Sequence, residues 1–241
     1  MLTTKFKVKS YDVFPNSTIK PSALQHYMQE YARRDCDEMA CTYQMMRDVN
    51  MVFVVTKLGI SVKKPVFAYD EIEVRTYNNR ISGVTFEREF EFLRDGEEVI
   101  HASTQWVVVK YDNRQIVRPR DFPFPISEAL IDCEKVELPR AVKCEGKELL
   151  GERIVRLSDL DENDHLNNCV YSDIALDFLP FDRKEDFVKE VRIIFRHEAV
   201  IGDKLLVSVG KNDSVFAVFA DNSTKESACF EAEYALGKIS G

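Results

Sequence analysis

The chain has 241 residues, and 45% of them are hydrophobic, so it can bury a substantial core in one or two domains. Its 33 basic and 41 acidic side chains give a formal net charge of -8, which argues against a general nucleic-acid binder. No apolar run of about 18 residues occurs and the N-terminus lacks a secretory pattern, so we expect no membrane span. The scattered Cys residues predict neither a zinc site nor a disulfide framework, and we expect reduced thiols in a cytoplasm.

The first half alternates apolar and polar residues, as half-buried strands do, around one helical segment. Residues 5–13 predict a strand. Residues 21–48 carry Leu, Tyr and Met near helical spacing, which predicts one long helix or a helix broken near Asp35–Asp37. Four further strands are expected over 51–64, 69–78, 84–94 and 97–111. Asp95-Gly96 predicts a tight hairpin between the last two.

The second half repeats this order after a segment with little periodicity. Residues 112–150 are rich in Pro and charge, which predicts a linker with one short helix at 127–133. A strand over 151–157 and a shorter helix over 168–179 are expected next. Four more strands are expected over 188–200, 203–210, 213–220 and 226–238. One helix followed by antiparallel strands is therefore predicted twice.

Two blocks of sequence align between the halves. Residues 8–19 (VKSYDVFPNSTI) match 155–166 (VRLSDLDENDHL) at an offset of 147, and residues 62–74 match 195–207 at an offset of 133. Because the two matches occur in the same order, we predict a duplicated module. The expected bounds are 1–125 for the N-terminal module, 126–150 for the linker and 151–241 for the C-terminal module.

The densest polar segment of the chain is LDENDHLNNCVY, residues 160–171. Asp161, Asn163 and His165 alternate, so in an extended stretch their side chains point to one side. A carboxylate beside an imidazole fixes the imidazole tautomer and raises its basicity, and an amide or a helix-start N–H can hold an oxyanion. These are the groups that acyl transfer to water requires, and the chain has no GxSxG nucleophile motif.

The same segment has two other interpretations. A metal site is disfavoured, because one His among hard oxygen donors is a poor zinc ligand set. A turn whose Asn167 or Asn168 caps the next helix is the structural alternative. The duplication favours chemistry, because the reactive side chains are confined to one half: Phe14, Thr18 and Pro65 stand where the second half has Asp161, His165 and Glu198.

The segment LDENDHLNNCVY resembles the D-x-N-x-H-(hydrophobic)-N-N-x-x-Y signature of hotdog-fold thioesterases. Nearly the whole chain is similar to the acyl-[acyl carrier protein] thioesterases of plants and bacteria, through segments that include FKVKSYDV, MQEYA, VFVVTKLGISV, STQWVVVKYDNRQIVRPRD and VRIIFRHEAVIGDKL. The resemblance implies an α+β fold, a tandem (double) hotdog in which each half is a long helix wrapped by an antiparallel β-sheet. It also implies hydrolysis of fatty acyl-carrier thioesters to free fatty acid and holo carrier protein, which terminates or diverts fatty acid synthesis.

The resemblance assigns catalytic roles to four residues. Asp161, Asn163 and His165 match the family's catalytic triplet, and Glu198 in FRHEA matches its acidic strand residue. Many plant members have a Cys at the next position, where this chain has Ala199, so a mechanism without a thiolate is implied. Whether Asp161 or Glu198 activates water or attacks directly stays open.

Four residues are expected to bind the acyl substrate: Asn168, Met28, Tyr31 and Trp106. Met and aromatic side chains suit a flexible acyl chain, and the resemblance implies that the first module determines chain length. Ordinary core packing is the alternative for each of them. Cys169 is interpreted as core filler, and no metal or cofactor is expected.

The expected partner is an acyl carrier protein with a phosphopantetheine-linked acyl chain. Such a carrier is acidic, which favours a basic docking face whose candidates are Arg33, Arg34, Lys63, Lys64, Arg114, Arg118, Arg120, Arg183 and Lys184. No nucleic-acid partner is expected, and both a monomer and a homodimer stay open. The alternative functions are an acyl-CoA thioesterase of the same fold, a less favoured hotdog dehydratase, and a non-catalytic fatty-acyl binding module.

Overall fold

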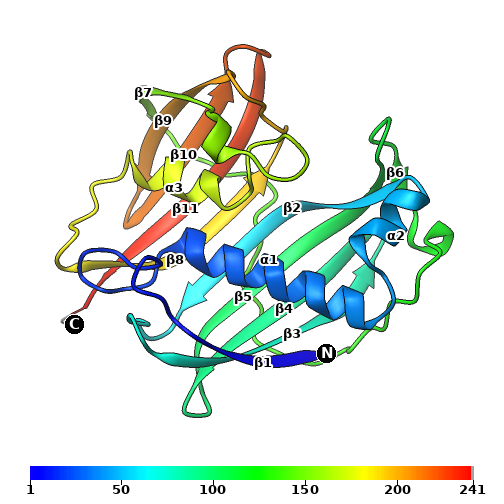
Figure 1. The fold of residues 1–241 in the computed structure, drawn as a ribbon. Coiled ribbons are helices and arrows are strands. Elements are labelled where there is room, and N and C mark those ends of the chain that lie inside the picture. The colour runs from blue at the N-terminus through cyan, green and yellow to red at the C-terminus, as the bar shows by residue number, and fades with distance from the viewer. Residues whose placement is uncertain (240–241) are drawn as a thin grey trace.

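The alternating segments form one antiparallel sheet that runs through both halves of the chain (Figure 1). The structure, a computed structural model, describes residues 1–239, and residues 240–241 of the expected C-terminal module lie outside the described residues. The strands follow the order β1-β3-β4-β5-β2-β8-β11-β10-β9-β7, with β6 paired to β5. Their bounds are β1 Leu2–Lys7, β2 Met51–Val62, β3 Glu71–Ser82, β4 Thr85–Arg94, β5 Glu97–Lys110, β6 Ile116–Val117, β7 Glu148–Ile154, β8 Asp186–Phe195, β9 Lys204–Asn212, β10 Val215–Asn222 and β11 Ser227–Lys238.

Most predicted strands are confirmed to within a few residues. The Asp95-Gly96 hairpin is confirmed as well, because both residues have positive φ angles, 54° and 82°, as a two-residue turn of this type requires. The first strand is shorter than expected and ends at Lys7. Beyond it the chain turns, and the Asp12 N–H donates to the Lys9 carbonyl at 3.0 Å.

The predicted break in the first helical segment is confirmed, a few residues beyond Asp35–Asp37. Within residues 1–239 the helices are α1 Pro21–Glu38, α2 Tyr43–Asp48, α3 Val170–Leu176 and the 3-10 turns η1 Pro119–Asp121 and η2 Leu157–Asp159. Ala40, with a φ of 56°, ends the first helix region, and Thr42 caps α2 by accepting the Met45 N–H at 3.2 Å. The shorter helix predicted for the second half is confirmed as α3.

The predicted helix at 127–133 is wrong, because this segment is irregular and bonded to the sheet. The Asn79 side chain on β3 accepts the Ile131 N–H at 2.8 Å and donates to the Ile131 carbonyl at 3.1 Å. These bonds occupy backbone groups that a helix would use. Val136 then lies so close to Gly59 of β2 that a Cβ on Gly59 would be 2.6 Å from Val136 Cγ1.

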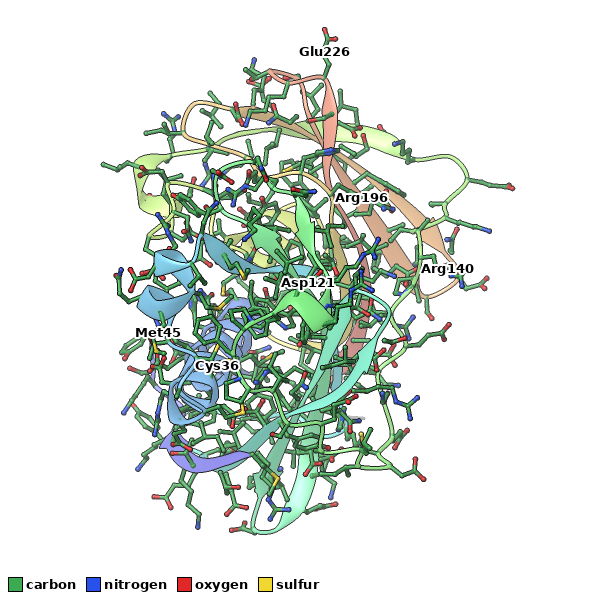
Figure 2. The ribbon with its side chains drawn as sticks, turned by 90° about the vertical axis from the view of Figure 1, so that its right-hand side faces the viewer. Cys36, Met45, Asp121, Arg140, Arg196 and Glu226 are labelled. Atoms are coloured by element: carbon green, nitrogen blue, oxygen red, sulfur yellow. The ribbon has the colours of Figure 1, made fainter. Side chains whose placement is uncertain are left out.

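The helices and the linker cover opposite faces of the sheet. Figure 2 places Cys36 of α1 and Met45 of α2 on one side of the strands and Arg140 of the linker on the other. Figure 1 shows α1 across one face of the sheet, with α3 near its N-terminal end. The main hydrophobic core lies between the sheet and these helices and draws buried residues from both halves.

The duplication predicted from the two offsets is confirmed in backbone contacts. Equivalent contacts recur in both halves: Val8 N to Asp70 O at 3.0 Å with Val155 N to Asp203 O at 2.9 Å, and the bridge Val13–Ile19 with the bridge Leu160–Leu166. The residues of the second-half contacts follow from those of the first half by adding an offset: 147 for Val8, Val13 and Ile19, and 133 for Asp70. The two modules therefore share loop geometry as well as hydrophobic pattern.

The modules meet about an approximate twofold axis in the middle of the sheet. β2 pairs antiparallel with β8, and Gly59 lies opposite Arg192, its own counterpart at the offset of 133. In the helix layer, buried Gln25 of α1 donates to Ser172 of α3, its counterpart at the offset of 147. One sheet and one core thus join the modules, and the bounds 1–125, 126–150 and 151–241 stay a prediction.

Candidate active site

A cavity of about 500 Å³ lies where the two modules meet. Apolar side chains from the first module's strands line part of it, including Val52 and Val55 of β2, Phe86 of β4 and Val109 of β5. Polar side chains of the second module line another part: Asp161, Asn163, His165 and Glu198. The structure thus brings the four catalytic candidates together beside an apolar space.

Residues 160–166 form a tight turn, as the turn interpretation of this segment expects, rather than an extended stretch. Leu160 and Leu166 form an isolated bridge, and the Asp161 N–H donates to the His165 carbonyl at 2.8 Å. Asp161 Oδ1 accepts the N–H of Asn163 at 2.8 Å and that of His165 at 3.3 Å. A carboxylate that organises neighbouring N–H groups is a common feature of polar turns. Asp161 therefore holds the loop that carries Asn163 and His165.

The carboxylate nearest to the His165 ring nitrogen Nδ1 comes from another segment of the chain. His165 Nδ1 lies 3.1 Å from Glu198 Oε2, in the segment after β8. The Leu166 N–H donates to the Ala199 carbonyl at 2.8 Å, which brings this segment beside the loop. A carboxylate this close to an imidazole nitrogen can accept a proton from it, and a ring proton on Nδ1 would leave Nε2 available to accept another.

Glu198 is in turn held by a side chain of the first module. Arg114 Nη2 donates to the same Oε2 atom at 3.0 Å, from the turn between β5 and β6. The Glu198 side chain is 49% exposed, whereas that of His165 is 22% exposed. The Glu198 carboxylate, between His165 and Arg114, thus lies at the opening of the cavity rather than in its interior.

The remaining amide groups of the motif have different partners. Asn163 Oδ1 accepts a hydrogen bond from the Tyr43 hydroxyl of α2 at 2.7 Å. Asn167 Oδ1, rather than Asn168, accepts the Cys169 N–H at 3.0 Å before α3, so Asn167 is the residue that supports the helix start. Asn168 lines the cavity.

The four predicted substrate-binding residues fall into two groups. Asn168 and Trp106 line the cavity, and the Trp106 indole donates to Thr104 Oγ1 at 2.8 Å. Met28 and Tyr31 are 3% and 6% exposed, belong to the main core and do not line this cavity. Other α1 residues, among them Gln29, Ala32 and Cys36, line it instead.

Two residues that contact the catalytic candidates could not be assigned this role from the sequence. Arg114 was only one of nine basic docking candidates, and Tyr43 was only part of an aromatic helix pattern. Each reaches a catalytic candidate through a long-range contact between modules, which spacing along the chain does not encode.

The thiols near the site are poor nucleophiles. Ala199 is fully buried and offers no sulfur. Burial raises the pKa of Cys169, and burial raises the pKa of Cys41 to about 12, so both are protonated at neutral pH. Neither Cys169 nor Cys41 is therefore a candidate nucleophile at neutral pH.

One group of residues has a geometry that could hold a metal ion, away from the cavity. The ligand atoms of Glu89, His101 and Cys133 lie within 4.8 Å of one another. His101 already lies between two carboxylates, with Nε2 3.2 Å from Glu89 and Nδ1 3.4 Å from Glu98. None of these residues lines the cavity, so this group is separate from the candidate active site.

A carboxylate-oriented imidazole and an amide beside an apolar cavity are suited to hydrolysing esters or thioesters of apolar acyl groups. Within residues 1–239, no helix has the length and apolar character that a bilayer crossing requires. The fold and site together define the class of acyl thioester hydrolases.

Comparison with family models identifies the class more closely. Residues 1–121 match the acyl-ACP thioesterase N-terminal domain, and residues 145–236 match the acyl-ACP thioesterase C-terminal domain. The chain belongs to the acyl-ACP thioesterase family. The predicted resemblance and the predicted thioester hydrolase class are confirmed.

Curated relatives agree with this membership. The chain is 25% identical over 256 residues to oleoyl-acyl carrier protein thioesterase 2, chloroplastic, of Arabidopsis thaliana, covering 93% of this chain and 67% of the relative. It is also 25% identical over 211 residues to a palmitoyl-acyl carrier protein thioesterase, chloroplastic, of the same plant, covering 80% and 51%. The chain thus spans about half to two thirds of the length of these relatives.

Solved structures confirm the predicted tandem hotdog fold. An acyl-ACP thioesterase from Bacteroides thetaiotaomicron VPI-5482 superposes with a TM-score of 0.87 at 17% identity, covering 98% of this chain and 97% of that one. A 12:0-ACP thioesterase from Umbellularia californica superposes with a TM-score of 0.78 at 17% identity and the same coverage. At these identities the likeness establishes the fold.

Proposed function

We propose that this chain hydrolyses fatty acyl thioesters of acyl carrier protein, releasing free fatty acid and the holo carrier. The observation that carries the proposal is the His165–Glu198 pair beside an apolar cavity, with Asn163 in the same cavity wall. Family membership supports thioester hydrolysis, and the apolar walls suit an acyl chain better than a polar substrate.

In the proposed mechanism, His165 moves protons and Glu198 orients it. His165 Nε2 accepts a proton from water, whose oxygen attacks the thioester carbonyl, and the amide N–H of Asn163 stabilises the resulting oxyanion. When the tetrahedral intermediate collapses, the C–S bond breaks and the proton on Nε2 passes to the departing sulfur. The products are a carboxylic acid and a thiol, so atoms and protons balance.

The two carboxylates have separate roles in this mechanism. Glu198 Oε2 lies 3.1 Å from His165 Nδ1, so its charge would stabilise the imidazolium that forms when Nε2 is protonated. Arg114 keeps Glu198 in place at the cavity opening. Asp161 directs Oδ1 at two backbone N–H groups, which supports a role in holding the loop. We therefore favour Glu198 over Asp161 as the carboxylate that acts on the reaction.

An acyl carrier protein is the proposed partner, and basic side chains at the cavity opening support it. Of the docking candidates, Arg33 and Arg114 line the cavity. Arg33 forms an ion pair with Glu162, and Arg114 forms one with Glu198. Lys63 and Lys64 pair with Glu98 and Glu97 outside the cavity. Docking near Arg33 and Arg114 would place the phosphopantetheine arm beside the catalytic loop. The cytoplasmic location and the choice between monomer and homodimer stay predictions.

Hydrolysis by purified enzyme of a panel of acyl-carrier thioesters, with mass spectrometry of the released acids, tests the proposal. We expect His165→Ala and Glu198→Gln to lower kcat by on the order of 100-fold or more, because each removes part of the proton-transfer pair. His26→Ala is the control, since His26 is exposed on α1 and does not line the cavity.

Two outcomes would contradict the proposed function. One is a wild-type protein that binds acyl-carrier thioesters without releasing acid, which would favour an acyl-binding module. The other is near wild-type kcat in both His165→Ala and Glu198→Gln. Faster hydrolysis of the matching acyl-CoA would instead support the alternative thioester substrate.

A further inference from the structure

The Asn163 amide ends a hydrogen-bond chain that begins in the first module. Tyr43 Oη donates to Asn163 Oδ1 at 2.7 Å across a sequence separation of 120 residues. Arg47 Nη1 donates to Tyr43 Oη at 3.0 Å. Tyr43 and Arg47 are both on α2, and neither belongs to the catalytic motif.

One arrangement of hydrogens gives the Tyr43 hydroxyl hydrogen an acceptor in this chain of contacts. A guanidinium donates and does not accept, so the Tyr43 oxygen accepts from Arg47 and its own hydrogen goes to Asn163. Asn163 must therefore turn its carbonyl oxygen toward Tyr43, which directs its amide nitrogen the other way. Among residues 1–239 that nitrogen donates to no protein acceptor, and Asn163 lines the cavity.

Arg47 is itself held in place by an aromatic ring. Its guanidinium carbon lies 3.2 Å from the centroid of the Tyr111 ring, at the end of β5. Arg114, which bonds Glu198, lies 5.6 Å from the same centroid. The Tyr111 ring thus backs both first-module contacts to the catalytic groups, the one to Asn163 and the one to Glu198.

We propose that Tyr43 is a positioning residue that sets the orientation of the Asn163 amide for thioester hydrolysis. The inference rests on the proposed function, because an oriented N–H group matters only if an oxyanion develops beside it. Without the Tyr43 hydroxyl the amide can rotate and present its oxygen, which repels an oxyanion. The module that lacks the catalytic residues thereby contributes to catalysis through orientation.

Replacing Tyr43 with Phe tests this, because the ring stays and only the hydroxyl is lost. We expect kcat to fall by on the order of tenfold while KM changes by less than about twofold, since binding of the acyl chain is not affected. Tyr27→Phe is the matched control: it removes a tyrosine hydroxyl bond of 2.6 Å to Asp12, away from the cavity. That variant should keep the wild-type kcat.

A double-mutant cycle separates positioning from a general structural effect. In an Asn163→Ala background, Tyr43→Phe should cost less than about twofold in kcat, because the residue that it orients is gone. Arg47→Met should resemble Tyr43→Phe. An unchanged kcat in Tyr43→Phe, or an equal loss with and without Asn163, would overturn the positioning role.

A second readout does not depend on activity. In ¹⁵N-labelled protein, the side-chain amide signals of Asn163 should shift in Tyr43→Phe and stay in place in Tyr27→Phe. Unchanged Asn163 signals would overturn the inference even if the enzyme is active. A wild-type protein without hydrolysis, but with the expected amide shift, would contradict the proposed function and leave the Tyr43 contact established.

Discussion

Asp161 and Glu198 carry the same functional group but have different partners. Glu198 Oε2 lies within ion-pair distance of the His165 ring and of Arg114, whereas Asp161 Oδ1 accepts hydrogen bonds from backbone N–H groups of its own loop. A carboxylate that stabilises a positive imidazolium needs its charge, but one that accepts two N–H bonds needs mainly an oxygen at the right place. At the residue scale, the two groups are therefore expected to respond differently to neutralisation.

Asp161→Asn keeps an acceptor oxygen in the same position and removes the charge. We expect kcat to fall less than about tenfold and the loop to stay folded, while Asp161→Ala loses both bonds and destabilises the loop by about 1–2 kcal/mol. Steady-state kinetics together with urea unfolding of both variants checks this. Asp164→Asn is the control, because it makes the same charge change at an exposed position of the same turn. A kcat loss in Asp161→Asn as large as that in Glu198→Gln would contradict the assignment and implicate Asp161 in the chemistry.

At the scale of elements, a buried ion pair fastens α1 to the sheet beside the cavity. Arg88 of β4 donates to Asp35 of α1 at 2.8 Å, and their side chains are 7% and 3% exposed. Arg88 also donates to Thr76 of β3 at 3.1 Å. Such a pair adds little compared with apolar residues of the same shape, but it fixes the position of the helix that lines the cavity.

Asp35→Ala is expected to lower the free energy of unfolding by about 3–5 kcal/mol, because it leaves the Arg88 guanidinium buried without its counter-charge. Replacing both partners, as Asp35→Leu with Arg88→Met, should recover most of that loss. Urea unfolding followed by circular dichroism measures both. Glu38→Ala, at the exposed end of α1, is the comparison variant. Equal stability of Asp35→Ala and Glu38→Ala would show that the pair is not needed.

At the scale of the whole molecule, the active site belongs to the junction of the two modules. The second module supplies Asn163, His165 and Glu198, and the first supplies the apolar wall together with Tyr43 and Arg114. The pairing of β2 with β8 holds the two halves in one sheet. Either module alone would lack part of the site.

Charge at the opening of the cavity leads to a prediction for the intact enzyme. The chain carries a net charge of -8, so we expect an acidic carrier to be drawn to the basic docking candidates, of which Arg33 and Arg114 line the cavity in ion pairs with Glu162 and Glu198. We expect kcat/KM for an acyl-carrier thioester to fall roughly fivefold as ionic strength rises from about 0.05 to about 0.5 M. A small uncharged acyl thioester should show little change. An equal fall for both substrates would contradict charge-guided docking.

Most of the helices and strands, their order and the duplication were predictable from the sequence, and so was the half of the chain that holds the catalytic candidates. Alternation of apolar residues is a local consequence of one face of a strand being buried, so it appears in any half-buried strand. The Asp95-Gly96 hairpin followed from residues that tolerate positive φ. The reactive positions stood out because one copy of the module kept Asp161 and His165 and the other did not.

The partners of those residues were decided only by the tertiary structure. The sequence places Asp161 two and four positions from Asn163 and His165, but the fold brings Glu198 within 3.1 Å of the His165 ring and bonds Asn163 to Tyr43. It also closed the polar segment into a turn and kept 127–133 from forming a helix, through bonds to the distant Asn79. The hydrophobic pattern is a property of neighbouring residues, so the sequence shows it directly. Hydrogen-bond partners depend instead on which distant segments the sheet brings together. For this protein the sequence alone determined which half holds the catalytic candidates, and the packing of both halves about the β2–β8 pairing decided which partners those candidates have.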